Sequence, residues 1–167
     1  SDWKAKRFWK DAAVVAVEDG FTVELDGRRV KTPAKRPLTL PTRAMADAVA
    51  AEWQAQEKQI DPRTMPVTKT ANAAIDKVAV QKAEVVDMLA AYGDSDLLCY
   101  RADSPEELVA RQAVQWDPML DWAAETLGVR LEPRQGIMHA PQTPDALAEL
   151  HRRTARLDAF ELAAFHD

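Results

Sequence analysis

The chain has 167 residues, of which 47% are hydrophobic and 29% charged, and its formal net charge at pH 7 is −5. These proportions are ordinary for a soluble globular protein. No apolar run approaches the ~20 residues that a membrane-spanning helix needs, and the charged opening SDWKAKRFWKD has no apolar core of a signal peptide, so we expect no membrane insertion.

Residues 12–40 are predicted to form short antiparallel strands. Phe21, Val23 and Leu25 alternate with polar residues, which is the pattern of a half-buried strand. Asp26-Gly27 is typical of a two-residue hairpin turn, and PLTLP adds a last short strand. A sheet of three or four such strands is too small to be stable alone, so it should pack on the helices that follow. We place an N-terminal β domain at residues 1–41.

The β region is basic and the rest of the chain is acidic. Residues 1–43 hold ten Lys and Arg against six Asp and Glu, whereas the remainder holds twelve against twenty-one. A nucleic-acid surface would need basic residues concentrated on one face with aromatic residues among them. Charged side chains that guard the edge of a small sheet explain the basic residues equally well, and we expect no nucleic-acid partner.

Two amphipathic helices are predicted between residues 42 and 78. In the first, the spacing of three and four residues places five side chains on one face: Met45, Val49, Trp53, Gln56 and Ile60. Thr42 is placed as its N-cap, and Asp61-Pro62 is predicted to end it. Pro66 suits the first turn of the second helix, because its missing N–H is not needed there.

Further helices are predicted over residues 80–92, 105–127, from Thr143-Pro144 and from Asp158. Ser104-Pro-Glu-Glu is predicted to be a capping box, and Pro118 is predicted to kink or split the helix that it opens. Leu108, Gln115 and Met119 are assigned to the inner side of that helix, and Gly93 and Gly128 to helix ends. The fold class is therefore α+β, with a small antiparallel β domain before a larger all-helical domain at 42–167. The apolar helical rhythm persists to Phe165, so we expect this domain to be truncated at its C-terminus.

No catalytic constellation emerges from the residue types that carry chemistry, and we expect no cofactor. The chain lacks a Gly-rich phosphate loop, and its one cysteine, Cys99, lies in an apolar stretch, which fits a reducing compartment. Asp94 and Asp96 could hold a divalent cation, or they could cap a turn; a metal site would need further oxygen ligands that the sequence does not identify. Gln112, Gln115, Trp116 and Asp117 are compatible with a docking surface and with a polar core.

The chain resembles the assembly chaperones of the F1-ATPase that act on its alpha subunit, which occur in mitochondria and alphaproteobacteria. The resemblance extends from about Arg7 to Gly136, and the order and spacing of its segments make it specific. These segments are RFWKD, ELDGRRVKTPAKRPLTLPT, AVAAEWQAQ, Met65-Pro-Val-Thr68, NAAID, DSDLLCYRA and QWDPMLDWAAETLGV.

The resemblance implies a non-enzymatic chaperone that binds the unassembled alpha subunit and assists assembly of the ATP synthase catalytic head. It also implies a cytoplasmic location in a bacterium, and the mitochondrial matrix for eukaryotic relatives. The client-binding residues expected from matching motifs are Glu52, Trp53, Gln56, Asp94, Asp96, Gln112, Trp116 and Asp117. Two alternatives remain open at this point: a general protein-binding adaptor, and a small metal-assisted enzyme that uses Asp94 and Asp96.

Overall fold

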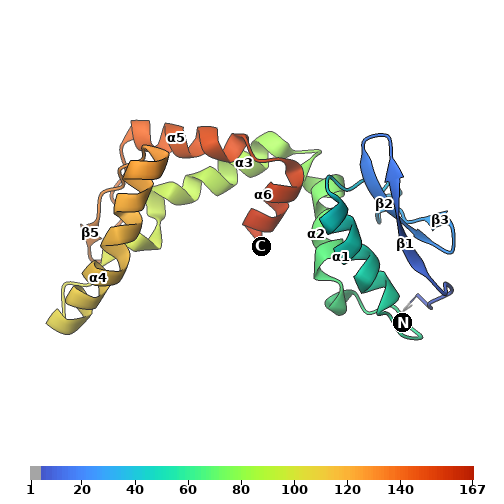
Figure 1. The fold of residues 1–167 in the computed structure, drawn as a ribbon. Coiled ribbons are helices and arrows are strands. Elements are labelled where there is room, and N and C mark those ends of the chain that lie inside the picture. Colours follow the sequence, from blue (N-terminus) through green and yellow to red (C-terminus); the bar gives the residue numbers. More distant parts are fainter. Residues whose placement is uncertain (1–4) are drawn as a thin grey trace. The chain divides into compact units, whose positions relative to one another are not determined.

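The computed structural model describes residues 5–167 (Figure 1); the first four residues of the charged opening segment lie outside this range. The chain forms two compact units. We call Ser1–Lys82 with Ala159–Asp167 the N-terminal unit, and Ala83–Asp158 the helical unit. A small antiparallel sheet near the N-terminus is followed mostly by helices, so the α+β fold class is confirmed.

The sheet of the N-terminal unit contains three strands in the order β1-β2-β3, with β1 at Ala12–Val17, β2 at Gly20–Leu25 and β3 at Arg28–Arg29. The turn between β2 and β3 is the expected two-residue one, because Leu25 pairs with Arg28 and both residues between them have positive φ, 50° at Asp26 and 82° at Gly27. The strand expected in PLTLP is reduced to two isolated bridges, Lys31 with Pro37 and Phe21 with Leu40.

Helices α1 (Arg43–Gln54), α2 (Pro66–Ala73) and α6 (Ala159–His166) complete this unit, with a π-helical turn at Ala74–Val78. The apolar faces of the sheet and of α1 share one core, to which α2 and α6 also contribute; its buried members are Trp9, Val23, Leu25, Val30, Leu38, Leu40, Ala46, Val49, Ala50 and Ala71. The compact unit therefore extends beyond the boundary expected at 41/42. A three-stranded sheet cannot bury its apolar face alone, and these helices form its second layer.

Helix α1 ends at Gln54, well before the predicted stop at Asp61-Pro62. The backbone beyond it pairs instead with the N-terminal segment: Arg7 N–H donates to Lys58 C=O at 3.0 Å, and Ile60 N–H donates to Ala5 C=O at 2.9 Å. Gln56 and Ile60 thus belong to a loop, not to the helical face. Helix α2 begins at Pro66 as predicted, after a short 3₁₀ turn at Pro62–Thr64.

The helical unit is built from α3 (Lys82–Ala91), α4 (Glu106–Trp122) and α5 (Pro144–Ala155), with 3₁₀ turns at Tyr92–Ser95 and Leu97–Cys99. Strands β4 (Tyr100–Arg101) and β5 (Arg134–Gln135) pair in parallel, and a π-helical turn at Ala123–Leu127 follows α4. Its core contains Cys99, Leu120, Val129, Leu131 and Ala146. Thr143 caps α5 through a bond from Ala146 N–H, and Gly128 closes the π-helical turn with φ 69°, both as predicted.

Several expectations about the helical unit were wrong. Pro105, not Ser104, occupies the N-cap position of α4, and no side chain caps that helix end. Helix α4 is not split at Pro118 but continues through it to Trp122; Pro118 is exposed, so the carbonyl left without a donor can bond to water. Leu108, Gln115 and Met119 are exposed. Gly93 does follow the end of α3 at Ala91, but without a positive φ; a Cβ there would lie 2.4 Å from Leu150 Cδ1, so a side chain at this position would force Leu150 of α5 to move.

Candidate binding surface

Of the two candidates for a cation site, Asp96 caps a turn and Asp94 tethers a distant loop. Asp94 Oδ1 accepts from Gln142 N–H at 2.7 Å, and its Oδ2 lies 3.1 Å from His139 Nε2. Asp96 Oδ1 accepts from Leu98 N–H at 2.9 Å at the start of a 3₁₀ turn. Among residues 5–167, no three His, Cys, Asp or Glu side chains are grouped as metal ligands. The contact of Asp96 is that of a turn cap, and those of Asp94 hold two segments of the fold together.

The Asp94 contacts hold a loop that displays two large apolar side chains. Ile137 is 94% exposed and Met138 is 84% exposed. Gly136 N–H donates to Arg101 C=O at 2.8 Å on one side of the loop, and the Asp94 bonds to His139 and Gln142 fix the other side. Sequence reasoning missed this loop, because GIM resembled a short extended segment and its exposure depends on the distant anchor Asp94.

Glu52 joins α1 to α2. Its Oε1 accepts from the backbone N–H groups of Val67 at 2.7 Å and Thr68 at 3.1 Å, in the first turn of α2. Partial burial raises the pKa of Glu52, and the bonds from Thr68 and Val67 oppose that shift without cancelling it. A carboxylate at this place satisfies donors that the helix itself leaves unpaired. The arrangement gives Glu52 a structural role.

Gln56 organises the loop between α1 and α2. Its Nε2 donates to Glu52 C=O at 3.0 Å and to Thr64 Oγ1 at 2.9 Å, while its Oε1 accepts from Asp61 N–H at 2.7 Å. Its side chain is buried, with 4% of the residue exposed. These three partners of the Gln56 side-chain amide all belong to the same loop or to the end of α1, so the hydrogen bonds hold the loop in one conformation.

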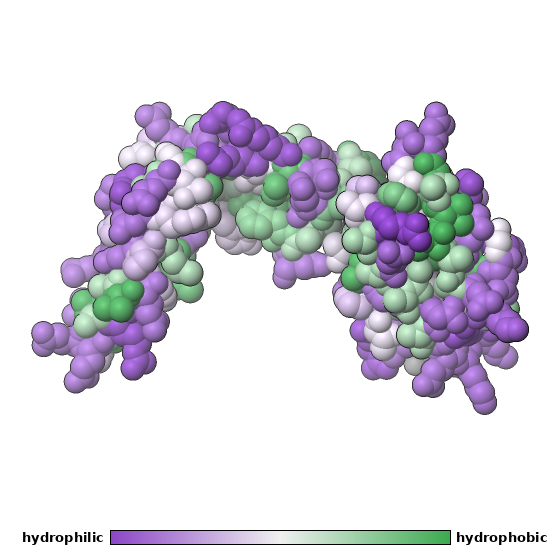
Figure 2. All heavy atoms as spheres, in the orientation of Figure 1, coloured by the Kyte–Doolittle hydropathy of each residue, from purple (hydrophilic) through white to green (hydrophobic). Residues whose placement is uncertain are grey.

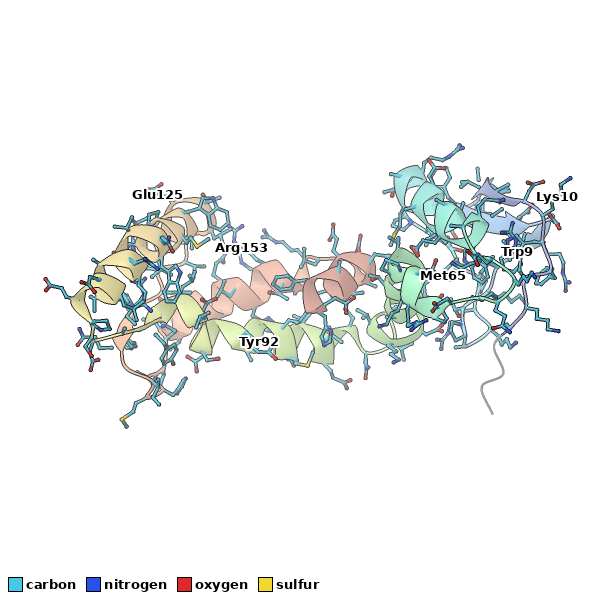
Figure 3. The ribbon with its side chains drawn as sticks, turned by 90° about the horizontal axis from the view of Figure 1, so that it is seen from below. Trp9, Lys10, Met65, Tyr92, Glu125 and Arg153 are labelled. Carbon is cyan, nitrogen blue, oxygen red and sulfur yellow. The ribbon has the colours of Figure 1, made fainter. Side chains whose placement is uncertain are left out.

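Trp53 packs against Trp9, with ring centroids 5.3 Å apart in an edge-to-face arrangement. Trp9 belongs to the buried core of the N-terminal unit, and Trp53 packs against that core; Figure 3 labels Trp9 in this unit. Within the described residues, neither indole N–H has a hydrogen-bond partner. The main contribution of Trp53 is therefore buried aromatic surface.

The remaining three predicted residues gather around Arg101. Its guanidinium donates to Asp117 Oδ1 at 2.8 Å and lies 5.5 Å from the centre of the Trp116 ring. Gln112 Oε1 accepts from Ala102 N–H at 2.8 Å, next to Arg101 in the chain. The sequence grouped Gln112, Gln115, Trp116 and Asp117; three of them meet at Arg101, whereas Gln115 is exposed and has no contact there among the described residues. Arg101 itself was missed, because only β4 brings it to them.

The eight predicted residues thus fall into three clusters, one in the N-terminal unit and two in the helical unit. Their polar atoms are largely engaged in hydrogen bonds within the chain. Asp117, which pairs with Arg101, nevertheless has 53% of its side chain accessible. The assignment of these residues as client contacts stays a prediction.

The known proteins that this chain resembles carry related names, either Atp12 or chaperone. The family described as ATP12 chaperone protein matches residues 6–124. Two solved structures of Atp12 from Paracoccus denitrificans match at 50% identity. The structure of a point mutant has a TM-score of 0.96 and covers 99% of this chain and 71% of its own. The other has a TM-score of 0.94 and covers 98% of this chain and 70% of its own. The Atu1473 protein of Agrobacterium tumefaciens, described as a candidate chaperone, matches with a TM-score of 0.89 at 45% identity, over 95% of this chain and 60% of that one.

A curated relative is the mitochondrial protein atp12 of Schizosaccharomyces pombe, 27% identical over 172 residues. The match covers 96% of this chain but 59% of the yeast protein, so the chain spans well under two thirds of that relative. The family and the Agrobacterium protein are named as chaperones, not as enzymes. Within residues 5–167, the helices are too short or too polar to cross a membrane.

Proposed function

Because the chain belongs to the ATP12 chaperone family, we propose that it is an assembly chaperone that binds the unassembled alpha subunit of the F1-ATPase. In this role it assists assembly of the ATP synthase catalytic head. The observation that carries the proposal is the family match over residues 6–124. The 50% identity to Paracoccus denitrificans Atp12, over 99% of this chain, supports it. We also propose a cytoplasmic location in a bacterium; the Paracoccus relative supports only the bacterial part of this proposal.

The physical task suits a binding protein that has no catalytic site. An unassembled subunit exposes the apolar surface that its partner would cover, and such surfaces aggregate. A chaperone that covers the surface must later give way to the true partner, which favours an interface of modest area with polar contacts. Exposed apolar side chains of the helical unit, such as Ile137 and Trp122, offer contact sites of that kind.

Co-expression with separate F1 subunits tests the proposal. We would express this chain with the alpha subunit or with the beta subunit and measure how much of each stays soluble and co-purifies. A longer form that matches the full length of the bacterial relatives should be run in parallel, since the chain covers 71% of the Paracoccus protein. Selective rescue of alpha by either form is the expected result. Rescue of neither subunit would contradict the proposal, and capture of other proteins alone would favour the adaptor alternative.

A further inference from the structure

The outward face of α4 carries an apolar patch. We define the α4 patch as Val114, Pro118, Met119 and Trp122. Steps of four residues join Val114, Pro118 and Trp122, and Met119 comes three residues before Trp122, so the four lie on one broad side of the helix. Val114 is 75% exposed, Met119 is 54% exposed and Trp122 is 56% exposed. In Figure 2, hydrophobic residues appear at the surface over α4 among hydrophilic ones.

The patch is not the face that holds α4 in the fold. Leu120 points to the core of the helical unit and is 4% exposed, and Trp116 lies beneath Arg101 on that inner side. A helix at a protein surface normally buries one apolar stripe and shows a polar face to water. Helix α4 therefore has a second apolar face, which is exposed and contributes no side chain to the core of the helical unit.

Pro118 adds a hydrogen-bond acceptor to the patch. Proline has no N–H, so the carbonyl of Val114 cannot accept the helical bond that residue 118 would otherwise donate. Val114 and Pro118 are both exposed, so the carbonyl that loses its usual helical donor belongs to the outer side of α4. An exposed acceptor between apolar side chains favours a partner that brings donors as well as apolar groups.

The charge around the patch is predominantly acidic. Residues 106–127 contain five acidic residues and a single basic one, Arg111. Asp117 and Asp121 border the patch and pair with Arg101 at 2.8 Å and Arg130 at 3.2 Å. Glu125, labelled in Figure 3, follows at the end of the helix. The helical unit as a whole, residues 83–158, has fourteen Asp and Glu against seven Lys and Arg. Its field attracts a cationic partner and repels a second copy of itself.

We propose that the α4 patch binds a segment of the client protein whose apolar residues are flanked by Lys or Arg. This inference rests on the proposed function, because the client is taken to be the unassembled alpha subunit. Trp122 and Met119 supply the apolar contact, Trp being enriched at binding hot spots. Glu125, Asp121 and the Val114 carbonyl receive the donors of the basic residues. The small size of the patch fits a complex that must later dissociate.

The test compares the binding of purified variants to the purified alpha subunit. Met119→Gln with Trp122→Gln keeps good helix formers and removes the apolar contact, and should weaken binding at least about tenfold. Glu125→Lys with Glu107→Lys reverses charge at exposed positions and should also weaken binding. The matched control is Val80→Gln with Phe165→Gln, which removes two exposed apolar side chains from the N-terminal unit and should leave affinity unchanged. Circular dichroism and melting temperature establish that each variant is folded.

Each outcome separates this inference from the proposed function. If the unmodified chain and the folded patch variant bind alpha equally, the α4 inference fails and the proposed function stands. If the unmodified chain binds neither alpha nor beta, both fail. Should the Gln variant not fold, unchanged affinity of the charge-reversal variant would overturn the inference. Loss of self-association or of vesicle binding in the variant, with unchanged affinity for alpha, would assign the patch to a second copy or to lipid and also overturn it.

Discussion

Glu52 Oε1 accepts a 2.7 Å hydrogen bond from the backbone N–H of Val67, so a carboxylate on α1 caps the first turn of α2. Replacing Glu52 with Ala leaves the N–H groups of Val67 and Thr68 without this acceptor and should lower the free energy of unfolding by about 1–3 kcal/mol. Glu52→Gln keeps an acceptor oxygen and is the matched control, with a smaller loss. Urea denaturation measures both. Equal stability of the Ala variant and the unmodified chain would contradict this role.

The raised pKa of Glu52 predicts the sign of a pH effect. Burial raises the pKa against two opposing backbone bonds, so the folded state holds the proton more tightly than the unfolded state. The stabilisation linked to this proton is full below the unfolded pKa of about 4.3 and is lost as pH rises through the folded pKa. The free energy of unfolding of the unmodified chain, minus that of Glu52→Gln, should therefore decrease as pH rises through that window. An increase over the same window would show that the hydrogen bonds dominate.

Trp53 is predicted to stabilise the N-terminal unit through packing with Trp9. Trp53→Ala should lower the free energy of unfolding by about 3–5 kcal/mol, as large-to-small changes in a core do. Trp122→Ala is the control, since Trp122 is 56% exposed and its loss should change stability by about 0.5 kcal/mol or less. If Trp53→Ala left the melting temperature unchanged and abolished client binding, Trp53 would instead be an interface residue.

Gly93 and Leu150 are predicted to be energetically coupled. A Cβ at position 93 would lie 2.4 Å from Leu150 Cδ1, so Gly93→Ala should destabilise the helical unit by about 1–3 kcal/mol through overpacking. Leu150→Ala removes the obstructing atom, and the double variant should be more stable than the sum of the two single changes predicts. A double-mutant cycle from denaturation curves measures this coupling. Simple additivity would mean that Leu150 moves aside without cost.

Asp94 is predicted to fix the loop that displays Ile137 and Met138. Asp94→Ala removes the acceptor of the Gln142 N–H and the partner of His139, so the Gln142 amide should exchange with solvent faster. Asp96→Ala is the control, because Asp96 bonds to Leu98 and should alter exchange there instead. Unchanged exchange at Gln142 in the Asp94 variant would show that other contacts hold the loop.

Local signals in the sequence predicted what depends on neighbouring residues. The Asp26-Gly27 turn, the Thr143 cap and the Gly128 helix end each need a residue type within a few positions, and all three were confirmed. The end of α1 was mispredicted, because the backbone of residues 58–60 pairs with residues 5–7. The outward position of Met119 was also missed, since apolar spacing alone cannot distinguish a buried face from a second, exposed one.

For the candidate site, too, the sequence predicted local groupings of residues but not the long-range contacts that complete them. The sequence grouped Gln112, Trp116 and Asp117 with the exposed Gln115 on one helix. The centre of the first three, Arg101, lies in β4, whose parallel pairing with β5 no local pattern encodes. The hydrogen bonds that Asp94 and Glu52 accept come from residues 48 and 15 positions away in the chain. Long-range contacts of this kind decide whether a polar residue is free to meet a partner or is used within the fold.

The binding of the purified chain to isolated F1 alpha and beta subunits tests the central claim most directly. Titration calorimetry with each subunit, followed by addition of the other, gives the affinity and shows whether the true partner displaces the chaperone. We expect saturable binding to alpha, none to beta, and release of the chain when beta joins alpha. Equal binding to both subunits, or to neither, would contradict the assignment of the alpha subunit as client.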